Sequence, residues 1–327
     1  MNKILIIRFS SIGDIVLTTP VIRCIRKQMP DAVIHYLTKE KFRQILEQNP
    51  YIDTIYTIKK DVNEVLLDLI GERYDFIIDL HNNIRSWRVK MALHSPSKAF
   101  NKLNLQKWMR VNLKINFLPE VHIVDRYLEA AKSLGITNDG MGLDFFLDPE
   151  KSDTQHSLPE AFQNGYLAIV IGGQHITKMY PVEQLIELCR NLNENVVLLG
   201  GPDDAANGAL ISNEAGTHVF NACGNYSVME SAWLLAGASH VITNDTGLMH
   251  IAAALRKDIT SVWGNTIPEF GMYPYLPKGI NSINKMIEVK GLNCRPCSKI
   301  GYNKCPKGHF KCMKEIDPHT ILDSIKL

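Results

Sequence analysis

A polar turn between a strand and a helix is the part of this sequence best suited to bind a ligand. Residues 241–243 have the pattern of a buried strand, the polar turn comprises Asn244, Asp245, Thr246 and Gly247, and a helix rich in small residues follows from Leu248. In an open α/β sheet this order places a carboxylate and the free N–H groups of a helix start at the carboxyl edge, where ligands and phosphates bind. A ligand with both hydroxyls and phosphate, such as a nucleotide sugar, suits such a pair. The alternative is that Asp245 or Thr246 only caps the helix.

Other polar side chains of the carboxyl-terminal half follow neighbouring strands. Thr177 and Lys178 precede a helix start, where a lysine can neutralise a diphosphate leaving group, although most loop lysines only face water. Asp203 and Asp204 can accept hydrogen bonds from ribose hydroxyls or cap a turn. His250 lies one helical turn beyond the polar turn, and it is either a donor-binding residue or a packed, hydrogen-bonded histidine.

The first strand of the chain also ends in a polar loop. Ser10, Ser11 and Gly13 resemble a phosphate-binding turn, but the loop lacks the spaced glycines of a dinucleotide fingerprint, so a nicotinamide cofactor is not supported. Asp14 follows at the presumed cleft. Its carboxylate can take a proton from an acceptor hydroxyl, or it can cap the next helix.

A basic segment lies between Asp79 and Glu120, with eight Lys and Arg residues and no acidic one. Such a segment favours an anionic partner. Because it also carries Trp87 and Trp108, a lipid or sugar surface is as plausible as nucleic acid, and a merely solvated basic face is the alternative. Its candidate acceptor-binding residues are Arg85 and Arg88.

Four cysteines gather near the carboxyl terminus. Cys294 and Cys297 have C-x-x-C spacing, and Cys305 and Cys312 follow. Four thiolates can hold zinc or, less commonly, an iron–sulfur cluster, but a second C-x-x-C pair is absent from the sequence. The alternatives are a structural zinc, reduced packing thiols and a redox pair.

Length and composition indicate a folded protein of about two domains. The chain has 327 residues, of which 45% are hydrophobic and 21% charged. The apolar run at the amino terminus is too short for a signal peptide, and the sequence has no apolar stretch long enough to cross a bilayer. We expect a cytoplasmic protein with reduced thiols.

Strands alternate with helical patterns throughout, which favours parallel βαβ units. Strands are expected at residues 3–9, 33–37, 55–58, 76–80, 166–171, 195–199, 240–243 and 260–263. A polar segment with proline near both ends, residues 148–159, is the candidate linker. The predicted fold is α/β, with two Rossmann-like, doubly wound domains facing each other across a cleft. The predicted domains are residues 1–155, which bind the acceptor, and residues 156–327, which bind the donor and carry the cysteine tail.

Several of these segments together resemble glycosyltransferase family nine, the lipopolysaccharide heptosyltransferases. The matching segments occur in the family's order and are residues 8–20, 79–86, 178–181, 198–202, 243–254 and 264–266. The cysteine tail resembles that of the heptosyltransferase II branch. The resemblance implies a GT-B fold and an inverting transfer of a heptose from an ADP-sugar to the lipopolysaccharide inner core.

The resemblance also assigns roles to particular residues. It implies that Asp14 is the catalytic base, that Lys178 contacts the donor phosphate and that Asp245 holds the hydroxyls of the donor sugar. The residues that match the helix start around the diphosphate are Thr246, Gly247 and Leu248. Arg85 matches a basic acceptor-side residue, and Tyr180 stands where the family commonly has Trp.

The expected partners are an ADP-sugar and an anionic lipid A, Kdo or heptose core acceptor, with peripheral contact at the inner face of the inner membrane and no nucleic acid. The Lys and helix amides can carry the phosphate charge, so catalysis is expected to need no cofactor. Two other functions stay open: a sugar-nucleotide epimerase or hydrolase of the same fold, and a noncatalytic nucleotide-sugar-binding protein. Asp14, Lys178 and Asp245 are all present, which argues against a noncatalytic binding protein.

Overall fold

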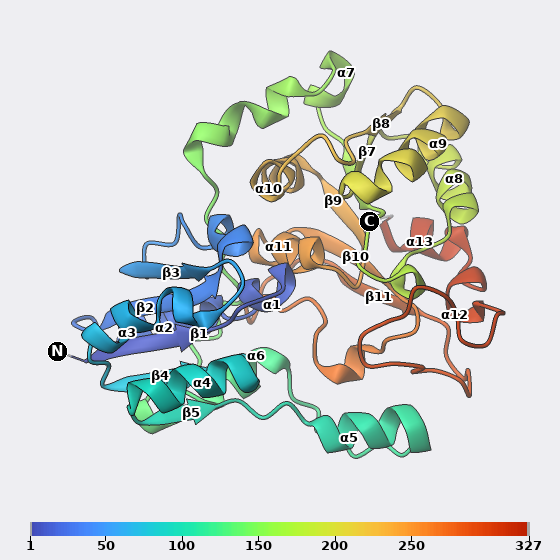
Figure 1. Cartoon of the computed structure of the whole chain (residues 1–327). Coiled ribbons are helices and arrows are strands. Elements are labelled where there is room, and N and C mark those ends of the chain that lie inside the picture. Colours follow the sequence, from blue (N-terminus) through green and yellow to red (C-terminus); the bar gives the residue numbers. More distant parts are fainter. Residues whose placement is uncertain (1, 326–327) are drawn as a thin grey trace. The chain divides into compact units, whose positions relative to one another are not determined.

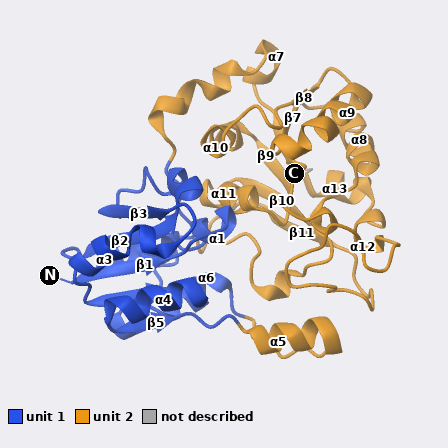
Figure 2. Ribbon diagram, in the orientation of Figure 1, with its two compact units in different colours: residues 1–102, 121–146 blue, residues 103–120, 147–327 orange. Residues whose placement is uncertain are grey.

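The computed structural model describes residues 2–325 (Figure 1). Contacts between residues divide the chain into two compact units (Figure 2). Unit 1 comprises the chain up to Lys102 together with Val121–Phe146, and unit 2 comprises Leu103–Glu120 together with the chain from Leu147 onward. The predicted linker contains a 3₁₀ helix at Pro149–Ser157. The division into an acceptor-binding domain, residues 1–155, and a donor-binding domain, residues 156–327, stays a prediction.

Unit 1 is built on a parallel sheet of five strands in the order β3-β2-β1-β4-β5. β1 is the central strand of this order. The apolar side chains of residues 4–7 have no exposed surface, as expected for a strand covered on both faces. The strands are β1 (Lys3–Ile7), β2 (Val33–Lys39), β3 (Thr54–Ile58), β4 (Phe76–Asp79) and β5 (Ser97–Ala99). The α-helices are α1 (Ile12–Val16), α2 (Thr19–Gln28), α3 (Leu66–Gly71), α4 (Ile84–Leu93) and α6 (Ile123–Glu129).

Unit 2 has a parallel sheet of six strands in the order β11-β10-β9-β6-β7-β8. The strands are β6 (Leu167–Val170), β7 (Val196–Leu199), β8 (Val219–Asn221), β9 (His240–Asn244), β10 (Asp258–Trp263) and β11 (Asn284–Glu288). The α-helices are α5 (Asn104–Trp108), α7 (Glu160–Gln163), α8 (Val182–Arg190), α9 (Ala205–Ala215), α10 (Val228–Gly237), α11 (Gly247–Ala254), α12 (Lys311–Lys314) and α13 (Pro318–Ile325). A π-helical turn, Met109–Leu113, continues α5.

Each sheet reverses its strand order at one point. In unit 1 the reversal lies between β1 and β4, and in unit 2 it lies between β6 and β9. At such a reversal the loops after the two central strands diverge and leave a crevice at the carboxyl edge, where α/β proteins bind ligands. The structure confirms the prediction of two α/β units with doubly wound parallel sheets. Within residues 2–325, it contains no helix that is both long and apolar enough to cross a membrane.

Candidate active site

The reversal point of unit 2 holds an ion pair. Lys178 follows β6, Asp245 follows β9, and the Lys178 Nζ lies 2.6 Å from the Asp245 Oδ2. The two side chains are only 18% and 10% exposed, respectively. The Thr266 hydroxyl, which follows β10, donates to the same carboxylate oxygen at 2.9 Å. Two residues 67 positions apart in the chain, both predicted from the sequence, therefore meet at one site.

Asn244, the last residue of β9, fixes the two loops to each other. Its buried amide donates to the carbonyls of Val170 and Ile171, each at 3.2 Å, and its Oδ1 accepts the backbone N–H of Tyr180 at 3.1 Å. The loop that carries Lys178 is thereby tied to the strand that carries Asp245. Preorganisation of this kind holds charged groups where a ligand needs them.

The start of α11 has no side-chain cap. Thr246 occupies the N-cap position in an extended conformation, but its side chain makes no capping hydrogen bond. Its Oγ1 is buried and has no hydrogen-bond partner among the described residues. The first N–H groups of a helix also lack partners within the helix. The structure therefore contradicts the alternative that Thr246 only caps the helix. Thr246, Gly247 and Leu248, which follow Asp245, are partly exposed residues.

Three further donor-side predictions fall on buried residues. Thr177 is buried, and its hydroxyl exchanges hydrogen bonds with the backbone of Tyr302, at 3.1 Å to the carbonyl and 2.8 Å from the N–H. Asp204 is buried, accepts the backbone N–H of Gly201 at 2.8 Å, and has a carboxyl pKa that burial raises. His250 is buried within α11. These positions support structural roles, and their direct contact with a donor stays a prediction.

Asp203 differs from its neighbour Asp204. Its side chain is exposed at the carboxyl edge of the sheet, where the 3₁₀ turn Pro202–Asp204 follows β7. The sequence left the ribose contact open between these two residues. Because Asp204 already caps the turn, Asp203 is the better placed to bind a ribose.

Asp14 lies in the first turn of α1, the helix that follows β1 at the reversal point of unit 1. Its Oδ1 lies 2.7 Å from an Nη of Arg8, and its Oδ2 accepts the backbone N–H of Ser11 at 3.1 Å and the Ser11 hydroxyl at 2.7 Å. The bond to the N–H of the N-cap is half of a capping box, so the predicted capping role is present. The carboxylate nevertheless keeps about a fifth of its surface exposed. Ser10 and Gly13 flank this group, and phosphate binding by the loop stays a prediction.

Arg8 is the ion-pair partner of Asp14. The guanidinium is buried and donates to the carbonyls of Ser10 and Leu80 and to the Tyr127 hydroxyl. A buried guanidinium with this many partners has a fixed orientation, and it fixes the carboxylate that it contacts.

His81 is a residue at this point that the sequence analysis missed. It follows β4 and packs edge-on against Phe9, with ring centres 5.1 Å apart. Burial, together with the positive charges of Arg8 and Lys102, lowers its pKa to about 4, so the imidazole is neutral at pH 7. Its Nδ1 is buried without a hydrogen-bond partner among the described residues. A polar residue directly after a central buried strand was the available signal.

The two predicted acceptor-binding arginines have different surroundings. Arg88 makes a paired contact with Asp61, at 2.9 and 3.2 Å, and also donates to Asn63. Arg85 is exposed in the first turn of α4. Arg88 is thus engaged within unit 1, whereas Arg85 presents its charge to solvent.

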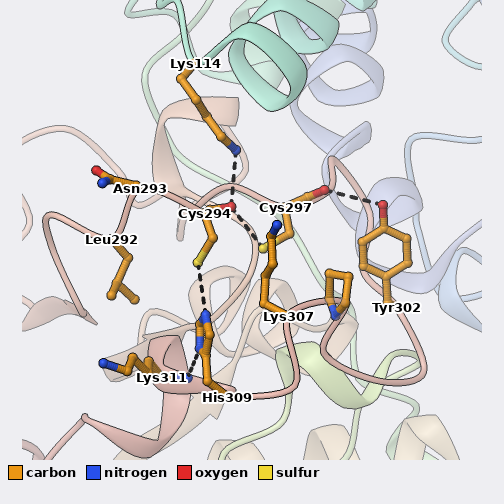
Figure 3. A pocket seen from close by; sticks show the side chains of 10 residues that line it. Lys114, Leu292, Asn293, Cys294, Cys297, Tyr302, Lys307, His309 and Lys311 are labelled. Atoms are coloured by element: carbon orange, nitrogen blue, oxygen red, sulfur yellow. Dashed lines mark hydrogen bonds between the residues drawn. The ribbon is translucent and has the colours of Figure 1, made fainter.

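The cysteine tail lines a cavity of about 650 Å³ (Figure 3). The Cys294 Sγ lies 3.7 Å from the His309 Nε2, and the Cys297 thiol donates to the Cys294 carbonyl at 3.0 Å. Burial and the neighbouring Cys294 raise the pKa of Cys297 to about 11, and burial raises that of Cys312 to about 12. All seven cysteines, Cys305 among them, are free thiols. Among the described residues, no three His, Cys, Asp or Glu side chains are arranged to hold a metal ion, so the structure does not support the predicted zinc.

Comparison with known proteins gives a family match over most of the chain. The sequence model of Glycosyltransferase family 9 (heptosyltransferase) matches residues 65–302. Lipopolysaccharide heptosyltransferase 1 of Campylobacter coli is 26% identical, over 99% of this chain and 98% of its own.

Solved structures share the fold. ADP-heptose lps heptosyltransferase II of E. coli has a TM-score of 0.75 and 21% identity, over 99% of this chain and 97% of its own. E. coli heptosyltransferase WaaC with ADP has a TM-score of 0.67 and 20% identity, over 99% of this chain and 98% of its own. The fold class predicted from the sequence, that of the GT-B glycosyltransferases, is confirmed. The chain belongs to glycosyltransferase family 9, the heptosyltransferases.

Proposed function

We propose that this chain transfers a heptose from ADP-heptose, with inversion, to the inner core of lipopolysaccharide. The observation that carries the proposal is the Lys178–Asp245 pair beside the uncapped start of α11. Lys178 and the helix N–H groups would neutralise the leaving diphosphate, and Asp245 would accept hydrogen bonds from the sugar hydroxyls. The family match and the ADP complex of the E. coli relative support ADP as the nucleotide.

Asp14 is the proposed base. An inverting transfer needs a carboxylate that removes the proton of the acceptor hydroxyl as its oxygen attacks the anomeric carbon. The bond between that carbon and the diphosphate oxygen breaks, and ADP leaves with the electron pair. Arg8 and Ser11 fix the orientation of this carboxylate. The reaction needs a base and groups that bind the leaving diphosphate. The proposed base lies on unit 1, and the proposed diphosphate-binding groups lie on unit 2.

The proposed acceptor is an anionic lipid of the lipid A, Kdo or heptose core type. The exposed Arg85 and the absence of acidic residues between positions 79 and 120 support an anionic acceptor rather than a neutral one. We place the reaction at the cytoplasmic face of the inner membrane, with peripheral contact between protein and lipid.

The test is an assay of the purified protein with a panel of nucleotide sugars and core acceptors, with product masses as the readout. We expect one heptose to be added only with ADP-heptose and only when an acceptor is present. Turnover of the donor without an acceptor would favour the epimerase or hydrolase alternative. Donor binding with no turnover at all would favour a noncatalytic binding protein.

The cysteine tail takes no part in this reaction scheme. A structural zinc there rests on the number and spacing of the four cysteines alone. Elemental analysis of the purified protein tests it: zinc in equimolar amount would establish the ion, and zinc at trace level would remove it from consideration.

A further inference from the structure

The segment Leu103–Glu120, here called the arm, packs on the cysteine tail. By contacts it belongs to unit 2, although unit 1 contains the chain on both sides of it (Figure 2). The Lys114 ammonium donates to the carbonyl of Cys294 at 3.1 Å (Figure 3) and to that of Pro296 at 2.7 Å. The Lys107 ammonium lies 5.7 Å from the centre of the Phe270 ring. These contacts give the arm a defined position on unit 2.

The arm exposes large apolar side chains to solvent. Five of them, each between 45% and 66% exposed, are Leu105, Trp108, Leu113, Ile115 and Phe117. So many large apolar side chains in one short exposed segment normally mark a surface that binds a partner or a membrane. A tryptophan among them is typical of the membrane–water interface.

Basic side chains line the space between the arm and the tail. The cavity of Figure 3 is lined by Lys114 of the arm and by Lys307, His309 and Lys311 of the tail, and none of its ten lining residues is acidic. Lys311 also lies 3.4 Å from Glu315, but this pair is half exposed and contributes little. The positive charge of the cavity is therefore not neutralised by its own walls.

A second cavity of about 610 Å³ shares Lys114 with the first and adds Arg110 and Lys290. The Nε of Arg110 is buried without a hydrogen-bond partner among the described residues. Of the two carboxylates that line this cavity, Glu288 is paired with Arg295 at 2.6 Å. Apolar side chains that face water thus lie in the same segment as Arg110 and Lys114, which line these basic cavities. Surfaces that bind the interface of anionic membranes combine these two properties.

We propose that the arm and the two cavities that it lines form a docking surface for a membrane that contains anionic phospholipid. The exposed apolar side chains enter the interfacial layer, and the lysines bind the lipid phosphates. This inference deepens the proposed function, because a lipid acceptor resides in such a membrane.

Vesicle binding tests the proposal directly. Wild-type protein is sedimented with vesicles of pure phosphatidylcholine and with vesicles of phosphatidylcholine and phosphatidylglycerol. We expect binding to the anionic vesicles only, and weaker binding in high salt. Each lysine near such a surface contributes roughly a five-fold increase in affinity, so Lys307→Gln with Lys311→Gln should weaken binding about 25-fold. Trp108→Ala with Leu113→Ser should weaken it as well.

A matched control has the same chemistry elsewhere in unit 2. Leu210→Ser with Lys285→Gln changes one exposed leucine and one exposed lysine away from the arm, and it should bind like wild type. The proposal is overturned if wild type binds neutral vesicles equally well, if both arm and tail variants bind like wild type, or if the control loses binding to the same extent.

Transfer assays separate this proposal from the proposed function. With a deacylated, water-soluble acceptor, the variants should keep the wild-type rate, and with the acceptor embedded in anionic vesicles they should lose it. A loss with both acceptors would overturn the docking role, since the residues would then act in the site or the fold. If wild type transfers to neither acceptor, the proposed function fails while the vesicle-binding result still decides the docking surface.

Discussion

Replacing Asp14 with Asn removes the charge of the proposed base with almost no change of shape. The amide cannot take a proton from an acceptor hydroxyl, so the contribution of general base catalysis is lost, typically a factor of about 10² to 10⁴ in rate. This corresponds to an increase of about 3 to 5 kcal/mol in the activation barrier. We therefore expect the kcat of Asp14→Asn to fall by about that factor, because no other carboxylate is bonded to Arg8 among the described residues.

The structure also bounds the cost of this substitution to folding. Arg8 loses its ion pair of 2.7 Å but keeps the carbonyls of Ser10 and Leu80 and the hydroxyl of Tyr127. A buried charge that keeps most of its hydrogen bonds loses about 1 to 3 kcal/mol of stability rather than the fold. Ser11→Ala is the matched control, because it removes the hydroxyl bonded to Asp14 at 2.7 Å and leaves the carboxylate.

The assay is initial-rate kinetics with the ADP-sugar and the core acceptor, together with calorimetric titration of ADP. Donor affinity should stay near wild type, because the groups proposed to bind the diphosphate lie on unit 2. Ser11→Ala should lose less than about ten-fold in kcat, as expected for one neutral hydrogen bond. A kcat of Asp14→Asn within ten-fold of wild type would refute the base assignment, and a change in KM alone would make Asp14 a binding residue.

Three further predictions concern the donor site, the packing beneath it and the buried histidine. Lys178→Met should weaken ADP binding about 10- to 100-fold through loss of a charge-assisted contact, whereas Asp245→Asn should strengthen ADP binding, because no carboxylate is left without its partner, and should weaken the preference for the ADP-sugar, both measured by calorimetry; equal losses of ADP affinity in the two variants would contradict the division of roles. Gly172→Ala should destabilise the protein by about 1 to 3 kcal/mol in urea unfolding, because its added methyl would overlap the Asp204 carboxylate, while Gly201→Ala, with that carboxylate 3.8 Å away, should be nearly neutral. Because the pKa of His81 is about 4 when folded and near 6.5 when unfolded, the unfolded chain binds the proton first, and stability should fall by about 2 to 3 kcal/mol between pH 7 and pH 4.5. His81→Gln should remove that part of the pH dependence, and an unchanged slope would contradict the depressed pKa.

The central strands could be predicted from the sequence because apolar runs buried on both faces have a strong pattern. The runs at residues 3–9, 33–37, 76–80 and 240–243 correspond to β1, β2, β4 and β9. The strands β5, β8 and β11 were missed. β5 and β8 have only three residues each, and β11 carries charged and exposed side chains at the edge of its sheet, so the signal of burial is weak there.

Residues of the site were predictable where they lie in a loop after a central strand, and less so where their side chains turn inward. Asp245 and Lys178 meet as the order of strands implies, because parallel strands end at one edge. The sequence could not show that Thr177 bonds to Tyr302, a partner 125 residues away, or that Asp204 caps its own turn. Nor does cysteine spacing determine whether four thiols converge, because their orientation depends on the packing of an irregular tail.

The Lys178–Asp245 pair also constrains how a donor can bind. A diphosphate that takes up the charge of Lys178 leaves Asp245, a nearly buried carboxylate, with the Thr266 hydroxyl as its remaining side-chain partner among the described residues. A buried charge that loses its partner costs several kcal/mol, and sugar hydroxyls that donate to Asp245 offset that cost. Free nucleoside diphosphate incurs the cost without this compensation, whereas the nucleotide sugar brings both groups. The ion pair therefore couples recognition of the phosphate to recognition of the sugar, and it favours the donor over the product that must leave.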